Sequence, residues 1–397
     1  MESKKKNNGL IIIIVLLLAI CGGFLGYKYG KSSITPRTKF IKAMNNYLEK
    51  NESLIDTTKL LKDGYTITTT NNLKVTSGSE EMFSGKFNTN NIYDGTNQYT
   101  EITFKEGSDS LKGIMYLKDN KAYFKLNDIF DKFYYMDIDT NTNDYNEAYN
   151  EIKESITKVV KEYFTEDKFV LTKEDGTDKI NVSLTGKDGA SLILKFYEEI
   201  KDNDKILGLI TSEDTSLDEV KSNLKEDIDT LKDDMESYSD EVVISYNMYL
   251  NKNTLVKQEL TLEDIVLTIT GEESGDITLT SAGATILNGT YSKENLTLKI
   301  TADMAKAEIN INRQNIKEDK ISGDYKIDIK LTSGGSTINI TLNTNIKYNK
   351  SASIPNIDLS TAKSFEEMSD SEQEEIYSKL YPILEPIMGS VEPRETY

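Results

Sequence analysis

Histidine, the side chain most often used as a general base, does not occur in this chain of 397 residues. The single cysteine, Cys21, lies within a long apolar run. Imidazole catalysis, the usual zinc sites and a cysteine nucleophile are therefore excluded. Ser155 and Lys158 stand in an S-x-x-K spacing, but the partner motifs of serine–lysine catalysis are missing, so we interpret this stretch as a solvated helix face.

One stretch resembles the start of a calcium-binding loop. Asp137, Asp139 and Asn141 have the D-x-D-x-N spacing of an EF-hand, but the sixth position is Thr142 instead of glycine and the twelfth is Ala148 instead of glutamate. Without the bidentate carboxylate, a polar turn before a helix is the better interpretation. The 66 acidic residues leave a pair of glycosidase carboxylates possible, but no pair stands out.

Tyrosine is abundant, with 23 copies and no tryptophan. Tyr134, Tyr135, Tyr246 and Tyr249 fall on expected strands, where they would line a pocket or a carbohydrate-binding surface, or simply pack with their hydroxyls at the rim. We favour packing. The sequence thus predicts a protein that is not an enzyme, with no catalytic, cofactor-binding or metal-binding residue, no cofactor, and unknown ligand-binding residues.

An apolar run near the start of the chain predicts a transmembrane helix over residues 10–29. The preceding residues 1–9 are basic, which predicts a cytoplasmic tail and an outer location for the rest. A cleaved signal peptide is one alternative. Lipidation of Cys21 is another, although Ile20 is bulky for a lipobox. The expected localisation is the plasma membrane, single-pass, with an extracellular bulk and the membrane as partner through the N-terminal helix.

The net charge of −19 predicts that nucleic acids are not partners, because an acidic surface repels them. No disulfide can form within the outer region, since no cysteine follows Cys21. The high content of asparagine, lysine and isoleucine suggests a low-GC Gram-positive bacterium.

Apolar spacing of three and four residues predicts amphipathic helices. They are expected at residues 36–62 with a possible break near Asn51, from 143 or 144 to 164, at 216–235 with a capping box of Ser216 and Glu219, and from about 369 onward. Alternation of apolar and polar residues predicts a meander of about six strands within 64–139, a hairpin around Asp175 and Gly176, strands at 190–200 and 205–211, and a long strand series within 241–348.

The expected fold class is α+β: a large, curved, half-barrel-like antiparallel sheet covered by amphipathic helices, plus the N-terminal transmembrane helix. One outer domain is expected over residues 30–390, with a possible sub-boundary near 213, followed by a loose tail at 391–397.

The hairpin VVISYNMYLNKNTLVKQELTL and the order of helix, meander, helices and strand series resemble the lipoprotein-carrier superfamily of the LolA and LppX types. The frequent aspartate and tryptophan of that hairpin are missing, and Asn251 stands at the turn. The layout is also similar to uncharacterised single-pass envelope proteins of low-GC Gram-positive bacteria. The resemblance implies a half-barrel closed by helices over an apolar cavity for acyl chains.

The expected function is therefore that of a membrane-anchored, extracytoplasmic, non-enzymatic protein that binds an apolar ligand, a lipid or a lipoprotein segment. The alternative is a structural or protein-interaction module at the cell surface without a ligand cavity. The sequence leaves the oligomeric state and the identity of the ligand open.

Overall fold

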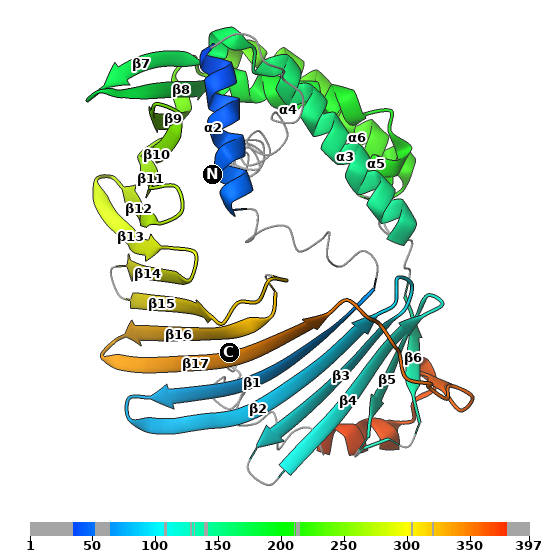
Figure 1. Cartoon of the computed structure of the whole chain (residues 1–397). Coiled ribbons are helices and arrows are strands. Elements are labelled where there is room, and N and C mark those ends of the chain that lie inside the picture. Colours follow the sequence, from blue (N-terminus) through cyan, green and yellow to red (C-terminus); the bar gives the residue numbers. More distant parts are fainter. Residues whose placement is uncertain are drawn as a thin grey trace. The chain divides into compact units, whose positions relative to one another are not determined.

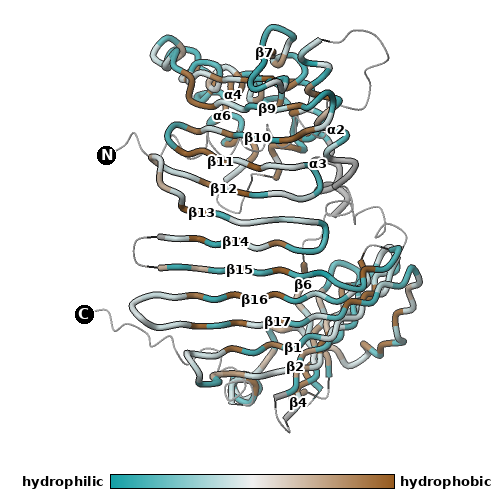
Figure 2. The backbone as a smooth tube through the Cα atoms, turned by 60° about the vertical axis from the view of Figure 1, so that its left-hand side comes forward, coloured by the Kyte–Doolittle hydropathy of each residue, from teal (hydrophilic) through white to brown (hydrophobic). Residues whose placement is uncertain are grey.

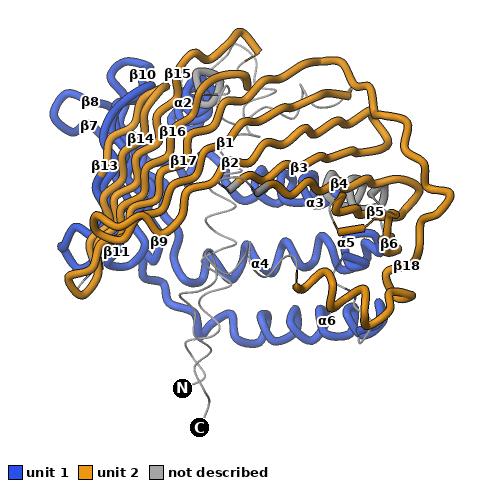
Figure 3. The backbone as a smooth tube through the Cα atoms, turned by 90° about the horizontal axis from the view of Figure 1, so that it is seen from below, with its two compact units in different colours: residues 1–52, 141–288 blue, residues 53–140, 289–397 orange. Residues whose placement is uncertain are grey.

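The structure is a computed structural model that describes residues 35–51, 64–106, 109–127, 129–130, 132–138, 142–209, 211, 215–302, 305–319 and 321–378. The chain divides into two compact units, each built from two separate stretches (Figure 3). Unit 1 comprises residues 1–52 and 141–288, and unit 2 comprises residues 53–140 and 289–397.

Unit 1 contains the main helices, which Figure 1 shows in blue and green. They are α2 (Pro36–Asn51), α3 (Thr142–Tyr163), α4 (Gly186–Ile200), α5 (Asp204–Gly208) and α6 (Leu217–Asp233). The short 3-10 helices η3 (Glu166–Lys168) and η4 (Met235–Ser237) follow α3 and α6. Ser216 caps α6, because its hydroxyl accepts from the Glu219 N–H at 3.3 Å, which confirms the Ser216 half of the predicted capping box.

The strands of unit 1 pair antiparallel. They are β7 (Val170–Glu174), β8 (Thr177–Thr185), β9 (Val242–Asn251), β10 (Thr254–Leu262), β11 (Ile265–Thr270) and β12 (Gly275–Ser281), and β13 (Ala284–Tyr291) crosses the unit boundary. Each strand from β7 to β12 pairs with the next along the chain. The predicted turn at Asp175 and Gly176 is confirmed, with φ of 49° and 80°.

The main core of unit 1 lies between its helices and strands β8 to β10. Phe40, Ile41 and Met44 of α2 pack there with Ile180 of β8 and Met248 of β9. A second cluster joins α4, α5 and α6 through a set of buried aliphatic residues: Ile200, Ile206, Leu207, Val220, Leu224 and Ile228.

Unit 2 consists mainly of antiparallel strands. The first stretch forms the predicted six-stranded meander, β1 (Tyr65–Ser77), β2 (Glu80–Tyr93), β3 (Gln98–Glu106), β4 (Asp109–Lys118), β5 (Lys121–Leu126) and β6 (Tyr134–Asp137). The second adds β14 (Asn295–Ala302), β15 (Ala305–Gln314), β16 (Gly323–Ser333), β17 (Ser336–Asn349), β18 (Lys363–Ser364) and η5 (Phe365–Glu367).

Strand β17 joins the two stretches of unit 2, since it pairs antiparallel with β1. The hydrogen-bonded order is therefore β14, β15, β16, β17, β1, β2, β3, β4, β5, β6, with β18 parallel to β6. Hydrophobic and hydrophilic residues alternate along β15, β16 and β17 (Figure 2). Alternation puts one kind on each side of the sheet.

The turn between β4 and β5 gives a direct test of the register in which these two strands pair. Asp119 and Asn120 have φ of 50° and 58°, as a type I′ hairpin turn requires, and the sequence predicted a tight turn there. Asn120→Val should lower the free energy of unfolding by about 1 to 2 kcal/mol, because a β-branched residue is strained at positive φ. Asn120→Gly is the control and should cost less than Asn120→Val, because glycine adopts positive φ without strain. Urea unfolding measures both, and equal losses would contradict the turn assignment.

Two expected strands are helices instead. Residues 190–200 belong to α4, and residues 205–211 overlap α5. A capping box starts α4: the Thr185 hydroxyl accepts from the Asp188 N–H at 3.0 Å, and the Asp188 carboxylate accepts from the Thr185 N–H at 2.9 Å. Asn203 caps α5 through a bond from the Ile206 N–H at 3.1 Å. Both capping residues can be recognised in the sequence, but the apolar run within residues 190–200 was interpreted as a strand.

The predicted fold class, an α+β half-barrel-like sheet covered by helices with a transmembrane helix, is wrong. The described chain is predominantly sheet, with eighteen strands. Its helices pack on β8, β9 and β10, whereas the apolar side chains of β11, β12 and β14 to β17 remain half-buried or exposed. Alternation indicates which side of a strand is apolar, but it does not indicate what covers that side.

The predicted localisation also requires correction. No helix in the described parts of the chain combines the length and the apolar character needed to cross a membrane. The expected span at residues 10–29 and the tails at 1–9 and 391–397 lie outside the described residues. The predicted single-pass location in the plasma membrane is therefore not supported.

Candidate functional site

Three rows of aliphatic side chains run across strands β14, β15, β16, β17 and β1 of unit 2. The strand registers align them as Leu296, Ile311, Ile327, Leu342 and Leu73; then Leu298, Ile309, Ile329, Ile340 and Val75; then Ile300, Ala307, Leu331 and Ile338. We name this set the aliphatic face. Each full row spans about 19 Å, since neighbouring strands lie about 4.8 Å apart.

The aliphatic face is incompletely buried. Ile300, Leu331 and Ile338 are 38%, 41% and 39% exposed, and every other member is half-buried. Soluble monomers rarely leave contiguous apolar patches of more than a few hundred Å² accessible without a binding role. This face is therefore the strongest site candidate in the described chain.

A polar row borders the aliphatic face on the same side of the sheet. It contains Arg313, Tyr325, Thr344 and Asn71, which are paired across β15, β16, β17 and β1. The Thr344 hydroxyl donates to Asn71 Oδ1 at 2.8 Å. The Asn71 amide donates to Thr69 Oγ1 at 2.7 Å and to the Phe87 carbonyl at 3.0 Å. One end of the aliphatic face therefore has a fixed polar border.

Arg313 is the charged member of this border. Its guanidinium carbon lies 5.5 Å from the centre of the Tyr325 ring. Its Nε is buried and has no hydrogen-bond partner. Within the part of the chain that the structure describes, the Arg313 side chain forms no ion pair, although the protein is strongly acidic.

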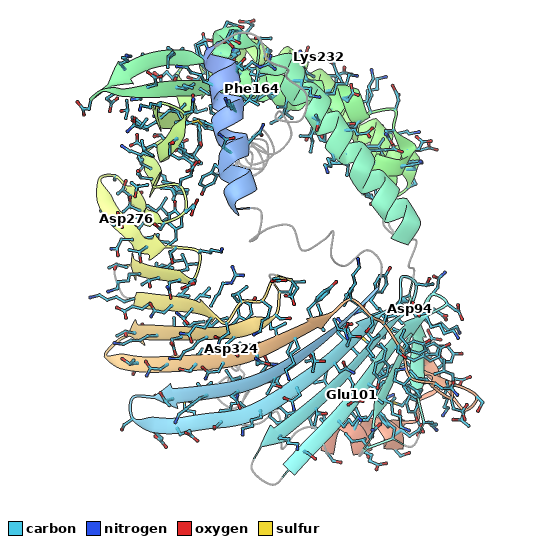
Figure 4. The ribbon with its side chains drawn as sticks, in the orientation of Figure 1. Asp94, Glu101, Phe164, Lys232, Asp276 and Asp324 are labelled. Atoms are coloured by element: carbon cyan, nitrogen blue, oxygen red, sulfur yellow. The ribbon has the colours of Figure 1, made fainter. Side chains whose placement is uncertain are left out.

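The opposite side of the same strands has a half-open hollow of ≈ 350 Å³. The lining residues that belong to this side come from β1, β15, β16 and β17: Thr70, Asn72, Asn312, Gln314, Asp324, Lys326, Asn343 and Asn345. Asp324, labelled in Figure 4, accepts from the amides of Asn345 and Asn315, each at 2.7 Å. These bonds hold the pKa of the Asp324 carboxyl below its usual value.

The polar hollow is the weaker candidate. Lys326 already pairs with Asp328 at 2.8 Å, and Asn72, Gln314 and Asn343 are exposed, so water satisfies them. Solvation of a polar sheet face explains the arrangement without a ligand.

The residues that the sequence analysis considered for chemistry are dispersed. Tyr134 of unit 2 is 1% exposed, Tyr249 of unit 1 is 6% exposed, and Tyr246 packs against the core of unit 1. The burial of Tyr134 and Tyr249 agrees with the packing interpretation, whereas Tyr135 is half-buried, with Lys121 Nζ 3.8 Å from the centre of its ring. Burial raises the pKa of Tyr246 far above its usual value, and its hydroxyl donates to Gln258 Oε1 at 2.6 Å.

The remaining sequence motifs give no site. The interpretation as a solvated helix face holds for Lys158, which is exposed on α3 and donates to Glu199 at 2.5 Å, but is wrong for Ser155, which is buried. In the calcium-like stretch, Asp137 ends β6 and is exposed, while Asp139 and Asn141 lie outside the described residues.

Sequence reasoning did not identify the aliphatic face as a site. The signal was present as strict alternation in IDIKL and INITLNTNI, but it was read as the inner side of a helix-covered sheet. The sequence did not indicate Arg313 as a site residue, because its lack of a carboxylate partner depends on which strands become neighbours.

Comparisons with known proteins do not identify a family. No family model matches the chain, and no curated protein matches it. A search of solved structures finds Pseudomonas aeruginosa OccK3 (OpdO), with a TM-score of 0.18 and 6% identity, covering 77% of this chain and 99% of that one. It also finds the CymD monoaromatic hydrocarbon channel, with a TM-score of 0.15 and 6% identity, covering 75% and 92%. Neither likeness is close enough to carry an argument.

Proposed function

We propose that this protein binds an apolar ligand with an acyl chain on the aliphatic face of unit 2. The observation that carries the proposal is the three continuous rows of Leu, Ile, Val and Ala side chains that remain half-buried or exposed. No catalytic step is part of the proposal.

The energy available is sufficient for binding. Removing about 300 Å² of apolar surface from water contributes about 7 kcal/mol at about 25 cal/mol per Å². Part of this gain offsets the entropy lost on association. A long acyl chain is thus a suitable occupant, since it covers a whole row while making only apolar contacts.

The composition of the face favours an acyl chain over a protein partner. Energetically dominant residues in protein interfaces are mostly Trp, Tyr and Arg, and they are surrounded by a polar rim. The three rows contain only aliphatic residues. Arg313 and Tyr325 stand at the border beside Ile311 and Ile327, and Phe83 of β2 adjoins the end of the second row, where it pairs with Val75.

A charge in the centre of the face tests the proposal. Ile329→Asp should weaken the binding of the fluorescent fatty acid cis-parinaric acid to the full chain by about tenfold or more, because a carboxylate in an apolar contact must be desolvated. Fluorescence titration gives the Kd. Lys330→Asp places the same side chain on the next residue of β16, on the opposite side of the sheet, and should leave the Kd unchanged.

Two results would contradict the proposal. One is the absence of saturable binding to the unmodified protein. The other is an equal loss in Ile329→Asp and Lys330→Asp. Self-association that the Ile329→Asp variant abolishes would instead assign the face to an interface between copies of this chain.

A further inference from the structure

Arg313 lies at the border of the aliphatic face, and the inference drawn from it rests on the function proposed above. The argument depends on Arg313, which lies two residues beyond Ile311 on the same side of β15. Successive residues on one side of a strand are about 7 Å apart. A ligand whose chain lies on the aliphatic face with one end beside Ile311 therefore has its terminal group within reach of the guanidinium.

The environment of Arg313 is unusual for an arginine in a folded protein. A guanidinium has five N–H donors, and partly buried arginines usually give several of them to carboxylates or carbonyls. Within the described chain, none of the guanidinium N–H groups of Arg313 has a hydrogen-bond acceptor, and its Nε is shielded from water. A buried donor without an acceptor is costly, so a bound acceptor would remove that cost.

The neighbours of Arg313 hold it in place without neutralising it. Tyr325 lies beside it in register on β16, and the Tyr325 hydroxyl donates to the Ile321 carbonyl at 2.9 Å, which fixes the ring. The guanidinium lies over this ring. Such a contact orients the cation but leaves the outer edge of its planar fork available for a ligand.

We propose that Arg313 binds the anionic head group, a carboxylate or a phosphate, of the amphipathic ligand whose chain occupies the aliphatic face. Both oxyanions can accept two parallel hydrogen bonds from the planar guanidinium in a bidentate contact. The acidic surface repels anions, so a cation without an ion pair beside the aliphatic rows is the distinguishing feature of the site.

The test compares an acid with the neutral alcohol of the same chain. Arg313→Gln in the full chain should weaken cis-parinaric acid by about tenfold or more, the loss expected for a charge-assisted contact, and should leave parinaryl alcohol unchanged. Lys330→Gln removes one positive charge from the opposite side of β16 and should change neither Kd. Equal loss of acid and alcohol in Arg313→Gln would overturn the inference, as would an acid Kd that does not change.

Competition against the bound alcohol distinguishes the two head groups. Oleate and lysophosphatidic acid carry the two oxyanions on comparable chains, and monooleoylglycerol carries neither. Displacement by either anionic lipid at lower concentration than monooleoylglycerol supports the inference, and the stronger of the two identifies the head group. Equal displacement by all three refutes the head-group contact but keeps the apolar site. Failure of acid and alcohol alike to bind the unmodified protein refutes the proposed function itself.

Discussion

Leu192→Ala and Ile193→Ala should each lower the free energy of unfolding of unit 1, by about 2 to 5 kcal/mol for Leu192 and by a similar or somewhat smaller amount for Ile193. These adjacent residues of α4 are 0% and 8% exposed. Leu192 belongs to the main core with the strands. Truncating a buried aliphatic side chain loses its transfer energy and leaves a cavity, so both substitutions are costly.

The pair also distinguishes a helix from the strand that the alternation of residues 190–200 first suggested. Neighbouring residues of a half-buried strand point to opposite sides, so only one of the two would be costly. The exposed Lys195→Ala is the control on the same helix and should change stability by less than about 0.5 kcal/mol. Urea unfolding followed by circular dichroism measures all three. A large loss at only one of the two aliphatic positions would contradict the helix.

Asp188→Ala should destabilise unit 1 by about 3 kcal/mol at pH 7. The carboxylate accepts from the Thr185 N–H at 2.9 Å, from Lys168 Nζ at 3.1 Å and from the Tyr163 hydroxyl. It therefore connects the start of α4 to the end of α3 and to η3. Removing it leaves several partly buried donors without an acceptor, and bonds to a charged group are among the stronger ones.

The same carboxylate gives a pH dependence with a definite sign. Burial by itself raises the pKa of Asp188, but the bonds from Thr185, Tyr163 and Lys168 lower it more, so its pKa lies below the usual value. The ionised form is thus favoured in the folded state. Its contribution is fully present above the pKa of the unfolded chain, about 3.9, and is lost as the pH falls through the lower folded value.

Unfolding measured from pH 7 down to pH 2 checks this dependence. The difference in stability between the unmodified protein and Asp188→Asn should be largest at neutral pH and should shrink below about pH 4. Asp229→Asn alters an exposed carboxylate of α6 and should give a small difference at every pH. A constant difference for Asp188→Asn would show that its ionised form is not specifically stabilised.

Local patterns in the sequence predicted much of the secondary structure. Ser216 begins α6, and Asp119 with Asn120 forms the β4–β5 turn, because capping and positive φ depend on residues next to each other. The error at 190–200 has an equally local origin. The run SLILKF reads as a strand unless the capping box of Thr185 and Asp188 is given more weight than the apolar run.

Several properties of the candidate site follow from residue types alone. The sequence by itself determined that imidazole chemistry is impossible and that the strands have one apolar side, because these depend only on which residues are present and on their alternation. The sequence also determined that the protein is acidic, which is why a cation without an ion pair points to a binding site.

Only the tertiary structure decided how these strands combine. The pairing of β17 with β1 aligns Leu342 with Leu73, which are far apart in the chain, and no short-range pattern specifies that register. The same pairings left Arg313 beside Tyr325 with no carboxylate, and left the aliphatic face half-buried. Contact and burial depend on the whole chain, so an apolar side becomes a candidate binding surface only when the fold leaves it uncovered.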